Sequence, residues 1–499
     1  MTNTTIAINL DPAALAKSLA GKFFINGALT PALAGQSFTV HSPATGLPIA
    51  QAPEGDAEDV DRAVQAAAHA QISWAKTPAR DRGKLLLEAG RVLTSHSEEL
   101  ARLVALETGK ALRTECRPEA TNTGDLFTFF GGLTPELKGE TLPLKSGVLA
   151  YTTREPIGVV GAILPWNAPL MLMAWKVAPA LAAGNTIVVK SAEEAPLCVL
   201  RAIQILGSVL PDGVLNVISG HGPVTGAALV RHPDVKKVTF TGSVETGKII
   251  YEAAAKKLIP VTLELGGKSP MIVMPDADLE KAAQGAIAGM RFTRQGQSCT
   301  ASSRMIVHES IHDAFVTKLK ELAGKLVIGD PMDEATDIGT IISKDQYDKI
   351  RSYISLAEAD SSCVLHTCSA LPTDASLKDG YYLQPTIVTG VNNSSVIAQE
   401  EIFGPVTCII KFKEYEEALK IANDSVFGLA ATIWTRDLKV AMDAANRLEA
   451  GLVQVNQNQV AGPNISYGGV KQSGLGKELS LESMLEHFTV KKTVIVNFE

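Results

Sequence analysis

The stretch V-V-G-A-I-L-P-W-N-A-P-L-M-L-M-A-W-K-V-A-P-A-L-A-A-G-N-T-I-V-V-K (159–190) decides the fold of this chain. It predicts a short buried strand over Val159–Leu164, a helix over Leu170–Ala183 and a second strand over Thr186–Lys190. Two apolar strands joined by a helix form a right-handed crossover in a parallel sheet. The stretch therefore predicts an α/β fold in which helices cover a parallel sheet.

The same alternation extends in both directions along the chain. Periodicity predicts further strands over Val214–Ile218, Val235–Phe240, Val261–Leu265, Met271–Val273, Met305–His308 and Leu452–Asn456. It predicts helices over Cys198–Leu210, Pro223–Arg231, Val244–Lys257, Leu279–Phe292, Ile311–Ala323 and Tyr415–Asn423. Residues 56–109 are helical in pattern, and residues 490–498 alternate as an exposed strand. No linker-like segment divides the series, so we expect two parallel sheets that share an interface with a cleft between them.

Composition excludes several classes of function. The chain has 499 residues, 46% of them hydrophobic, and a net charge of -7 with no basic cluster, which argues against nucleic acid as a partner. No apolar run approaches the roughly 18 residues of a membrane span, and no basic residue precedes the apolar N-terminal stretch as in a secretory signal. The six cysteines are few and lack metal-ligand spacing, so we expect no metal site and a reducing, cytoplasmic location.

One cysteine stands in an unusual setting. Cys299 lies among small and polar residues in R-F-T-R-Q-G-Q-S-C-T-A-S-S-R (291–304), and Gly296 indicates a turn or a close approach nearby. Small neighbours leave room for a substrate to reach the sulfur, whereas structural cysteines usually lie among larger apolar residues. The window alone fits either a nucleophile or an inert buried thiol.

A glycine-containing turn is a candidate binding site for phosphate. The segment T-F-T-G-S-V-E-T-G-K (239–248) joins a strand to a helix, but Ile249 stands where a nucleotide triphosphatase needs a magnesium-binding hydroxyl. An NTPase is therefore disfavoured. A helix N-terminus with Gly242 and Ser243 instead suits a diphosphate without metal, although a plain strand-helix turn is the alternative.

An acidic residue follows the strand over Thr186–Lys190. Glu193 stands at the carboxyl end of that strand, where ligands bind in open α/β sheets and where a carboxylate can accept hydrogen bonds from ribose hydroxyls. It would also repel a 2'-phosphate, which favours NAD over NADP, although Lys190 partly offsets the repulsion. The G-x-G-x-x-G fingerprint of an ordinary Rossmann dehydrogenase is absent from the chain.

Several segments together resemble one family. They are L-P-W-N-A-P-L (164–170), K-S-A-E (190–193), F-T-G-S-V-E-T-G (240–247), L-E-L-G-G-K-S-P (263–270), Q-G-Q-S-C (295–299), E-E-I-F-G-P-V (400–406) and Y-G-G-V-K-Q-S-G-L-G-K-E (467–478). In order and spacing the chain resembles the NAD(P)-dependent aldehyde dehydrogenase superfamily over nearly its whole length.

The resemblance implies two Rossmann-like parallel-sheet domains and a small β arm. The NAD-binding domain would comprise residues 1–135 and 157–265, and the catalytic domain residues 266–480. Residues 136–156 and 481–499 would form the arm that joins subunits into a homodimer or homotetramer.

The resemblance also implies roles for four catalytic residues. Cys299 would add to the aldehyde carbonyl, and the amide of Asn167 would stabilise the oxyanion. After hydride transfer, Glu264 would activate the water that hydrolyses the thioester, and Lys176 would assist proton movement near it. Contacts to NAD, with NADP less favoured, would come from Trp166, Lys190, Glu193, Gly242, Ser243, Leu265, Glu401 and Phe403.

Two small residues depart from the bulk that relatives carry in the substrate tunnel. Ala168 and Ala461 stand where an aromatic residue is common, while Trp175 and Tyr467 would form tunnel walls. We expect a wide tunnel and a bulky or aromatic aldehyde, unless other side chains fill the space.

Two other kinds of protein remain open within the family resemblance, an acylating enzyme and a non-catalytic structural relative. An acylating relative passes the thioester to coenzyme A but generally lacks the glutamate found here at position 264. A non-catalytic structural relative would not need Cys299, Glu264 and Asn167 together.

Overall fold

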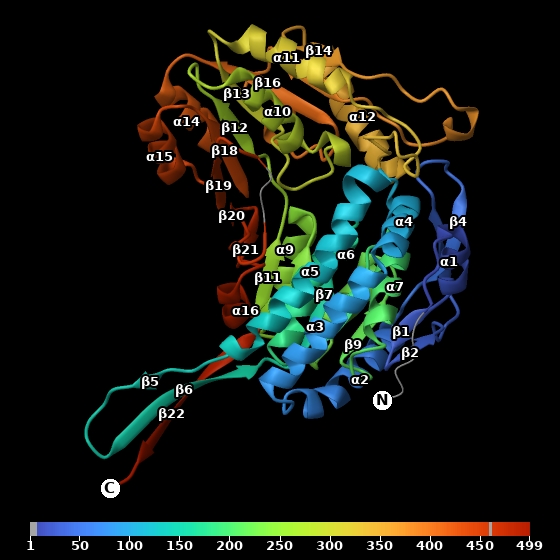
Figure 1. The fold of residues 1–499 in the computed structure, drawn as a ribbon, viewed down its shortest axis with the longest axis vertical. Coiled ribbons are helices and arrows are strands. Elements are labelled where there is room, and N and C mark those ends of the chain that lie inside the picture. Colours follow the sequence, from blue (N-terminus) through green and yellow to red (C-terminus); the bar gives the residue numbers. More distant parts are fainter. Residues whose placement is uncertain (1–6, 459–461) are drawn as a thin grey trace.

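The computed structural model describes residues 7–458 and 462–499. Two large sheets occupy separate lobes, and a thin β arm projects from the body (Figure 1). The fold is α/β with mostly parallel sheets, as the sequence predicts.

The first sheet contains the stretch 159–190. Its strand order is β2-β1-β9-β8-β7-β10-β11-β21. The five central strands are parallel: β7 (Val159–Ile163), β8 (Thr186–Lys190), β9 (Leu215–Ile218), β10 (Val235–Thr241) and β11 (Val261–Glu264). The antiparallel edge strands are β1 (Phe23–Ile25) with β2 (Ala28–Thr30), and β21 (Gly474–Leu475). Every residue of β7 and β8 is buried, which explains their continuous apolar sequence.

Helices cover this first sheet and extend past its edge. They are α2 (Ala57–Trp74), α3 (Ala79–Ser95), α4 (Ser97–Thr108), α5 (Arg117–Leu133), α6 (Pro169–Ala182), α7 (Pro196–Leu206), α8 (Ala227–Arg231) and α9 (Val244–Ala255). The N-terminal segment adds α1 (Pro12–Leu19) and a hairpin of β3 (Ser37–His41) and β4 (Pro48–Pro53). The helix predicted over Pro223–Arg231 begins as a π-helical turn, Gly222–Gly226, and becomes α-helical only at α8.

The second sheet has the order β14-β15-β16-β13-β12-β18-β19. Its parallel strands are β12 (Pro270–Val273), β13 (Arg304–His308), β15 (Thr386–Thr389), β16 (Val406–Phe412), β18 (Ala430–Trp434) and β19 (Leu452–Val455), and β14 (Val364–Thr367) is antiparallel. Its helices are α10 (Leu279–Met290), α11 (His312–Gly324), α12 (Lys344–Ala359), α13 (Val396–Gln399), α14 (Tyr415–Asn423) and α15 (Leu438–Arg447). A small sheet joins β17 (Phe427–Gly428) to β20 (Val470–Lys471), and α16 (Leu481–His487) leads to the arm.

The arm is a three-stranded sheet in the order β22-β6-β5. The C-terminal strand β22 (Thr489–Asn497) pairs antiparallel with β6 (Val148–Pro156) of the same chain along its whole length, and β5 (Thr141–Leu142) pairs with the other edge of β6. The alternating tail is therefore an edge strand whose paired residues lie 333 to 349 positions earlier in the chain. The strand β21 lies within 266–480 yet joins the first sheet, so the proposed domain boundaries remain predictions.

In the described part of the chain, no helix combines the length and the apolar character needed to cross a membrane.

Candidate active site

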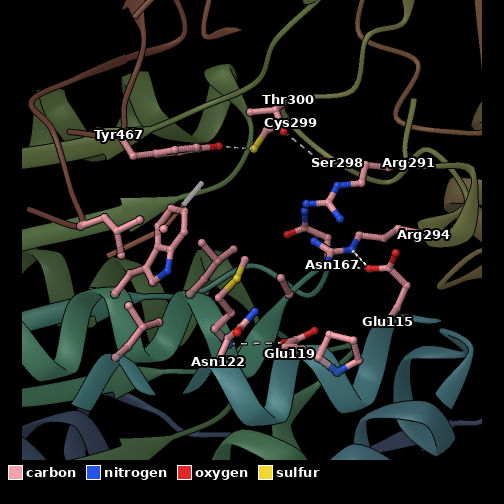
Figure 2. A pocket seen from close by; sticks show the side chains of 18 of the residues that line it. Glu115, Glu119, Asn122, Asn167, Arg291, Arg294, Ser298, Cys299, Thr300 and Tyr467 are labelled. Atoms are coloured by element: carbon pink, nitrogen blue, oxygen red, sulfur yellow. Dashed lines mark hydrogen bonds and ion pairs between the residues drawn. The ribbon is translucent and has the colours of Figure 1, made fainter. Parts of the chain in front are cut away.

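Two cavities meet at Cys299 and Asn167. One has a volume of about 350 Å³ and the other about 190 Å³, and Cys299 and Asn167 are the two residues that line both. Figure 2 shows the larger cavity, with Cys299 and Asn167 among the labelled side chains. A group held in either cavity therefore faces the same thiol and the same amide.

The backbone around Cys299 is tightly constrained. Gly296 has a φ of 65°, and a methyl group there would lie 2.1 Å from the carbonyl oxygen of Gly404. Only glycine fits this turn, as its position before the cysteine predicts. Gln295 also adopts a positive φ, 55°, and its turn ends a short 3-10 helix before the cysteine loop. The loop thus holds the sulfur at a fixed place between the cavities.

The half-buried Cys299 thiol lies beside a phenol. Its Sγ lies 3.3 Å from the hydroxyl oxygen of Tyr467. Burial raises the pKa of Cys299 to about 11, and the nearby carboxylates of Glu401 and Glu264 act in the same direction. The Tyr467 hydrogen bond and the Arg294 charge lower it. A nucleophilic thiolate here depends on the groups that lower the pKa of Cys299 against the effect of burial.

Asn167 follows strand β7 and precedes helix α6. Its side-chain Nδ2 donates to the carbonyl of Gln297, 3.2 Å away, in the cysteine loop. Its own carbonyl accepts from Nζ of Lys110 at 3.0 Å, and Lys110 forms a buried ion pair with Glu119. Glu119 in turn accepts from the backbone N–H of Leu170 at 2.9 Å. This network fixes the amide beside the sulfur, where an oxyanion would form.

Glu264 is a buried carboxylate at the end of β11. Neither of its oxygens has a hydrogen-bond partner among the described protein groups. Burial raises its pKa well above the usual value, and the charge of Glu478 adds to this effect, while Lys176 opposes it. Lys176 Nζ is held 2.6 Å from Glu478, with both side chains buried. A carboxylate of raised pKa with both oxygens unused by the protein can accept a proton from water.

The smaller cavity contains most of the predicted cofactor residues. Its lining includes Trp166, Gly242, Ser243, Leu265, Glu401 and Phe403, together with Gln346 and Lys349, which the sequence analysis missed. Ser243 caps helix α9, its Oγ accepting from the N–H of Thr246 at 3.2 Å. Gly266 brings backbone close to Glu401, because a methyl group there would lie 2.2 Å from the carboxylate. A helix N-terminus, a half-buried carboxylate and two aromatic rings suit a dinucleotide.

Lys190 and Glu193 do not line either cavity. They form an ion pair with each other, with 2.7 Å between Nζ and Oε2, at the carboxyl end of β8. Burial opposes ionisation of Glu193, but the charge and hydrogen bond of Lys190, together with a backbone hydrogen bond and the charge of His221, outweigh it and lower the pKa of that carboxyl. Glu193 therefore stays charged, and its contact with a ribose remains a prediction.

The larger cavity contains three of the four predicted tunnel residues. Ala168, Trp175 and Tyr467 line it, and the rings of Trp175 and Tyr467 meet edge to face with centroids 4.7 Å apart. Ala461, the fourth, lies outside the described residues.

Charged residues of this cavity were not predicted as site residues. Arg294 Nη2 lies 2.7 Å from Glu115, while Arg291 and Asp125 also line the wall. Burial opposes ionisation of Glu115, but the charges of Arg294 and Arg291 and the Thr293 hydrogen bond together outweigh it and lower the pKa of that carboxyl. Both arginines precede Cys299 by less than ten residues, a signal visible in the sequence. Glu115 carries no such signal, because a π-helical turn over Leu112–Cys116 brings it to the site.

A family model described as "Aldehyde dehydrogenase family" matches residues 31–494. The chain belongs to the aldehyde dehydrogenase family. The match confirms the resemblance drawn from the motifs, and it makes the chain an enzyme of aldehyde oxidation.

Relatives within the family carry names with different substrates. The chain is 43% identical to the mitochondrial benzaldehyde dehydrogenase of Antirrhinum majus over 477 residues, which cover 95% of this chain and 88% of that protein. It is 39% identical to an acetaldehyde dehydrogenase of Pseudomonas aeruginosa, covering 95% of this chain and 94% of that protein.

A solved family structure contains the cofactor. The NAD+ complex of the aldehyde dehydrogenase from Bacillus cereus superposes with a TM-score of 0.93 at 38% identity, and the match covers 99% of this chain and all of that one. The aldehyde dehydrogenase architecture inferred from the motifs is thereby confirmed.

Proposed function

We propose that this enzyme oxidises a bulky or aromatic aldehyde to the carboxylic acid with NAD, and that Cys299, Asn167 and Glu264 carry out the reaction. The observation that carries the proposal is the junction of the two cavities at Cys299 and Asn167. An aldehyde in the larger cavity and a nicotinamide in the smaller would both reach the sulfur. NAD bound in the solved relative supports this choice of oxidant.

The first step forms a bond between Cys299 and the aldehyde carbon. The thiolate adds to the carbonyl, and its negative charge moves to the former carbonyl oxygen, giving a tetrahedral thiohemiacetal. The Nδ2 group of Asn167, already beside the loop, donates a hydrogen bond to that oxyanion. The nicotinamide of NAD would supply a hydride acceptor here, and loss of a hydride from the thiohemiacetal carbon would leave a thioester on Cys299.

The second step hydrolyses the thioester. Glu264 takes a proton from water, the resulting hydroxide attacks the acyl carbon, and the Cys299 thiolate leaves as the carboxylic acid is released. The raised pKa of Glu264 makes it a better base than an exposed glutamate. Its presence supports water over coenzyme A as the acyl acceptor. The buried Lys176–Glu478 pair next to it offers a place to pass the proton.

The substrate and cofactor preferences rest on size and charge. A cavity of about 350 Å³ has room for a ring, and Ala168, only 1% exposed, leaves that room at the sulfur end. The name of the plant relative, which acts on benzaldehyde, supports an aromatic substrate. The ionised Glu193 supports NAD over NADP.

Cys299→Ala tests the proposal directly. We expect loss of aldehyde oxidation with every substrate while NAD binding, measured by calorimetry, is retained. Cys363→Ala is the matched control, because Cys363 is also a half-buried free thiol but lies beside β14, away from both cavities. Oxidation of aldehydes by Cys299→Ala at the wild-type rate would overturn the proposal.

A further inference from the structure

A second side chain touches the reacting sulfur. The hydroxyl of Tyr467 lies 3.3 Å from Sγ of Cys299, and Figure 2 shows the phenol ring extending toward that atom. Sequence reasoning places Tyr467 only in the wall of the tunnel. We propose that Tyr467 is a catalytic residue whose hydroxyl donates a hydrogen bond to the Cys299 thiolate and increases the fraction of Cys299 that is ionised in the resting enzyme. This inference rests on the proposed function, because it takes Cys299 as the nucleophile.

Three contacts fix the position of the Tyr467 hydroxyl: one to its ring, one to its backbone and one to the hydroxyl itself. Tyr467 is 6% exposed, and its ring packs edge to face against Trp175 at an interplanar angle of 68°. Its backbone N–H donates to the carbonyl of Glu478 at 3.0 Å, and the N–H of Glu478 donates back at 2.7 Å. A buried phenol needs a partner for its polar end, and the sulfur supplies it. The packing around Tyr467 thus holds its hydroxyl beside the Cys299 sulfur.

The direction of the hydrogen bond follows from the chemistry of both groups. A thiolate carries no proton, so the phenol must donate. Burial raises the pKa of Tyr467 well above its usual value, and the nearby Cys299 charge adds to this, so the phenol keeps its proton. The other charged groups near the sulfur are Glu401, Glu264, Arg294 and Arg291. The carboxylates oppose ionisation of the thiol and Arg294 favours it, whereas Tyr467 acts by direct contact.

The hydrogen bond is strongest before the reaction begins. Ionisation of Cys299 releases its proton to solvent through the cavity, and the negative charge stays on sulfur. When the C–S bond forms, that charge moves to the substrate oxygen, which Asn167 faces. Sulfur then becomes a weak acceptor, and the Tyr467 contact loses most of its strength. The tyrosine therefore increases the population of thiolate and contributes little to the transition state.

Tyr467→Phe tests this role because it removes only the oxygen atom. Loss of a hydrogen bond to a charged group lowers the thiolate fraction at least about tenfold at a fixed pH below the thiol pKa. A thiolate of higher pKa is about threefold more nucleophilic. We therefore expect iodoacetamide to alkylate Cys299 at least about threefold more slowly in Tyr467→Phe than in the wild type. Peptide mapping identifies the alkylated cysteine, and the rates are measured both without and with NAD. In a pH titration, the thiolate absorbance of Tyr467→Phe should rise at a pH about one unit higher than that of the wild type. The same titration of Cys299→Ala is subtracted to isolate the signal of Cys299.

Tyr382→Phe is the matched control, because Tyr382 is also a 6% exposed tyrosine that loses only its oxygen atom, but it lines neither cavity. We expect its alkylation rate and thiolate titration to match the wild type. Both variants are first checked for an unchanged unfolding transition and NAD affinity. An unchanged alkylation rate and titration in Tyr467→Phe would overturn the inference, even if the KM for aldehyde rose. Failure of the proposed function is a separate result, because it appears as activity in Cys299→Ala.

Discussion

Glu401 illustrates how burial changes the behaviour of a single side chain. Burial raises its pKa to about 7, and the carboxylate also accepts from the N–H of Gly267 at 2.9 Å. A ribose hydroxyl donates best to the ionised form, so we expect NAD to bind more tightly as pH rises through about 7. Calorimetry across this range should show the increase in wild-type protein. Glu401→Gln should bind more weakly with a flat pH dependence; a flat wild-type curve would contradict the assignment.

Ala168 controls the space beside the sulfur. Ala168→Phe fills part of the larger cavity, so we expect kcat/KM to fall about 10- to 100-fold for benzaldehyde, a loss of about 1–3 kcal/mol in transition-state binding. Acetaldehyde is the internal control and should lose little. Steady-state kinetics with both aldehydes measures the difference. Equal losses for the two would refute the wide tunnel.

Single residues also show the limit of sequence reasoning about the site. Motifs identified Cys299 and Asn167, which the structure brings to one junction. They could not show that Lys190 pairs with Glu193, because spacing along the chain does not give the direction of a long side chain. Residues that reach the site from a distant segment, such as Glu115, have no local pattern to reveal them.

Among the structural elements, strands and helices with simple periodicity were predicted well. The strand Thr186–Lys190 and the helix Tyr415–Asn423 have the predicted bounds. Helix α5 was not predicted, because glycine and threonine lower its helix propensity. Tertiary contact explains it: a methyl group on Gly124 would lie 2.4 Å from Oγ1 of Thr94 in α3, so glycine permits the two helices to approach closely. That approach places α5 in the wall of the larger cavity.

One residue at the N-terminus of α9 affects both the stability of that helix and the proposed binding of NAD. Ser243 caps this helix and lines the smaller cavity. Ser243→Ala should lower the free energy of unfolding by about 1 kcal/mol, through loss of the cap, and should also weaken NAD binding several-fold. Denaturant unfolding and calorimetry measure the two effects.

Asp437→Ala provides the matched control for this prediction. Asp437 caps α15 by accepting from the N–H groups of Lys439 and Val440, and it lines neither cavity. It should lose similar stability and keep its NAD affinity. Equal weakening of NAD binding in both variants would show that the α9 terminus has no special role.

On the scale of the whole molecule, the β arm presents an exposed edge. In the described residues, the outer edge of β22 has no pairing strand, and Ile495 on it is 64% exposed. An unpaired apolar edge is a surface for pairing with another chain. We propose that the arm joins subunits into a homodimer or homotetramer.

Ile495→Lys tests the role of the arm. A charge on this strand should convert the assembly to smaller species in sedimentation experiments, because it would be buried without a partner. Leu438→Lys is the control, since Leu438 is 73% exposed on the body and away from the arm. If both variants keep the wild-type mass, the arm does not hold subunits together.

The most direct test of the mechanism is the intact mass of Glu264→Gln after mixing with NAD and benzaldehyde. Without the base, the thioester should form but hydrolyse slowly, so the account predicts a covalent acyl adduct that maps to the peptide containing Cys299. Reduced cofactor should appear as a single burst of about one equivalent per active site. Continued wild-type turnover with no adduct would contradict the assignment of Glu264 as the base that releases the acid.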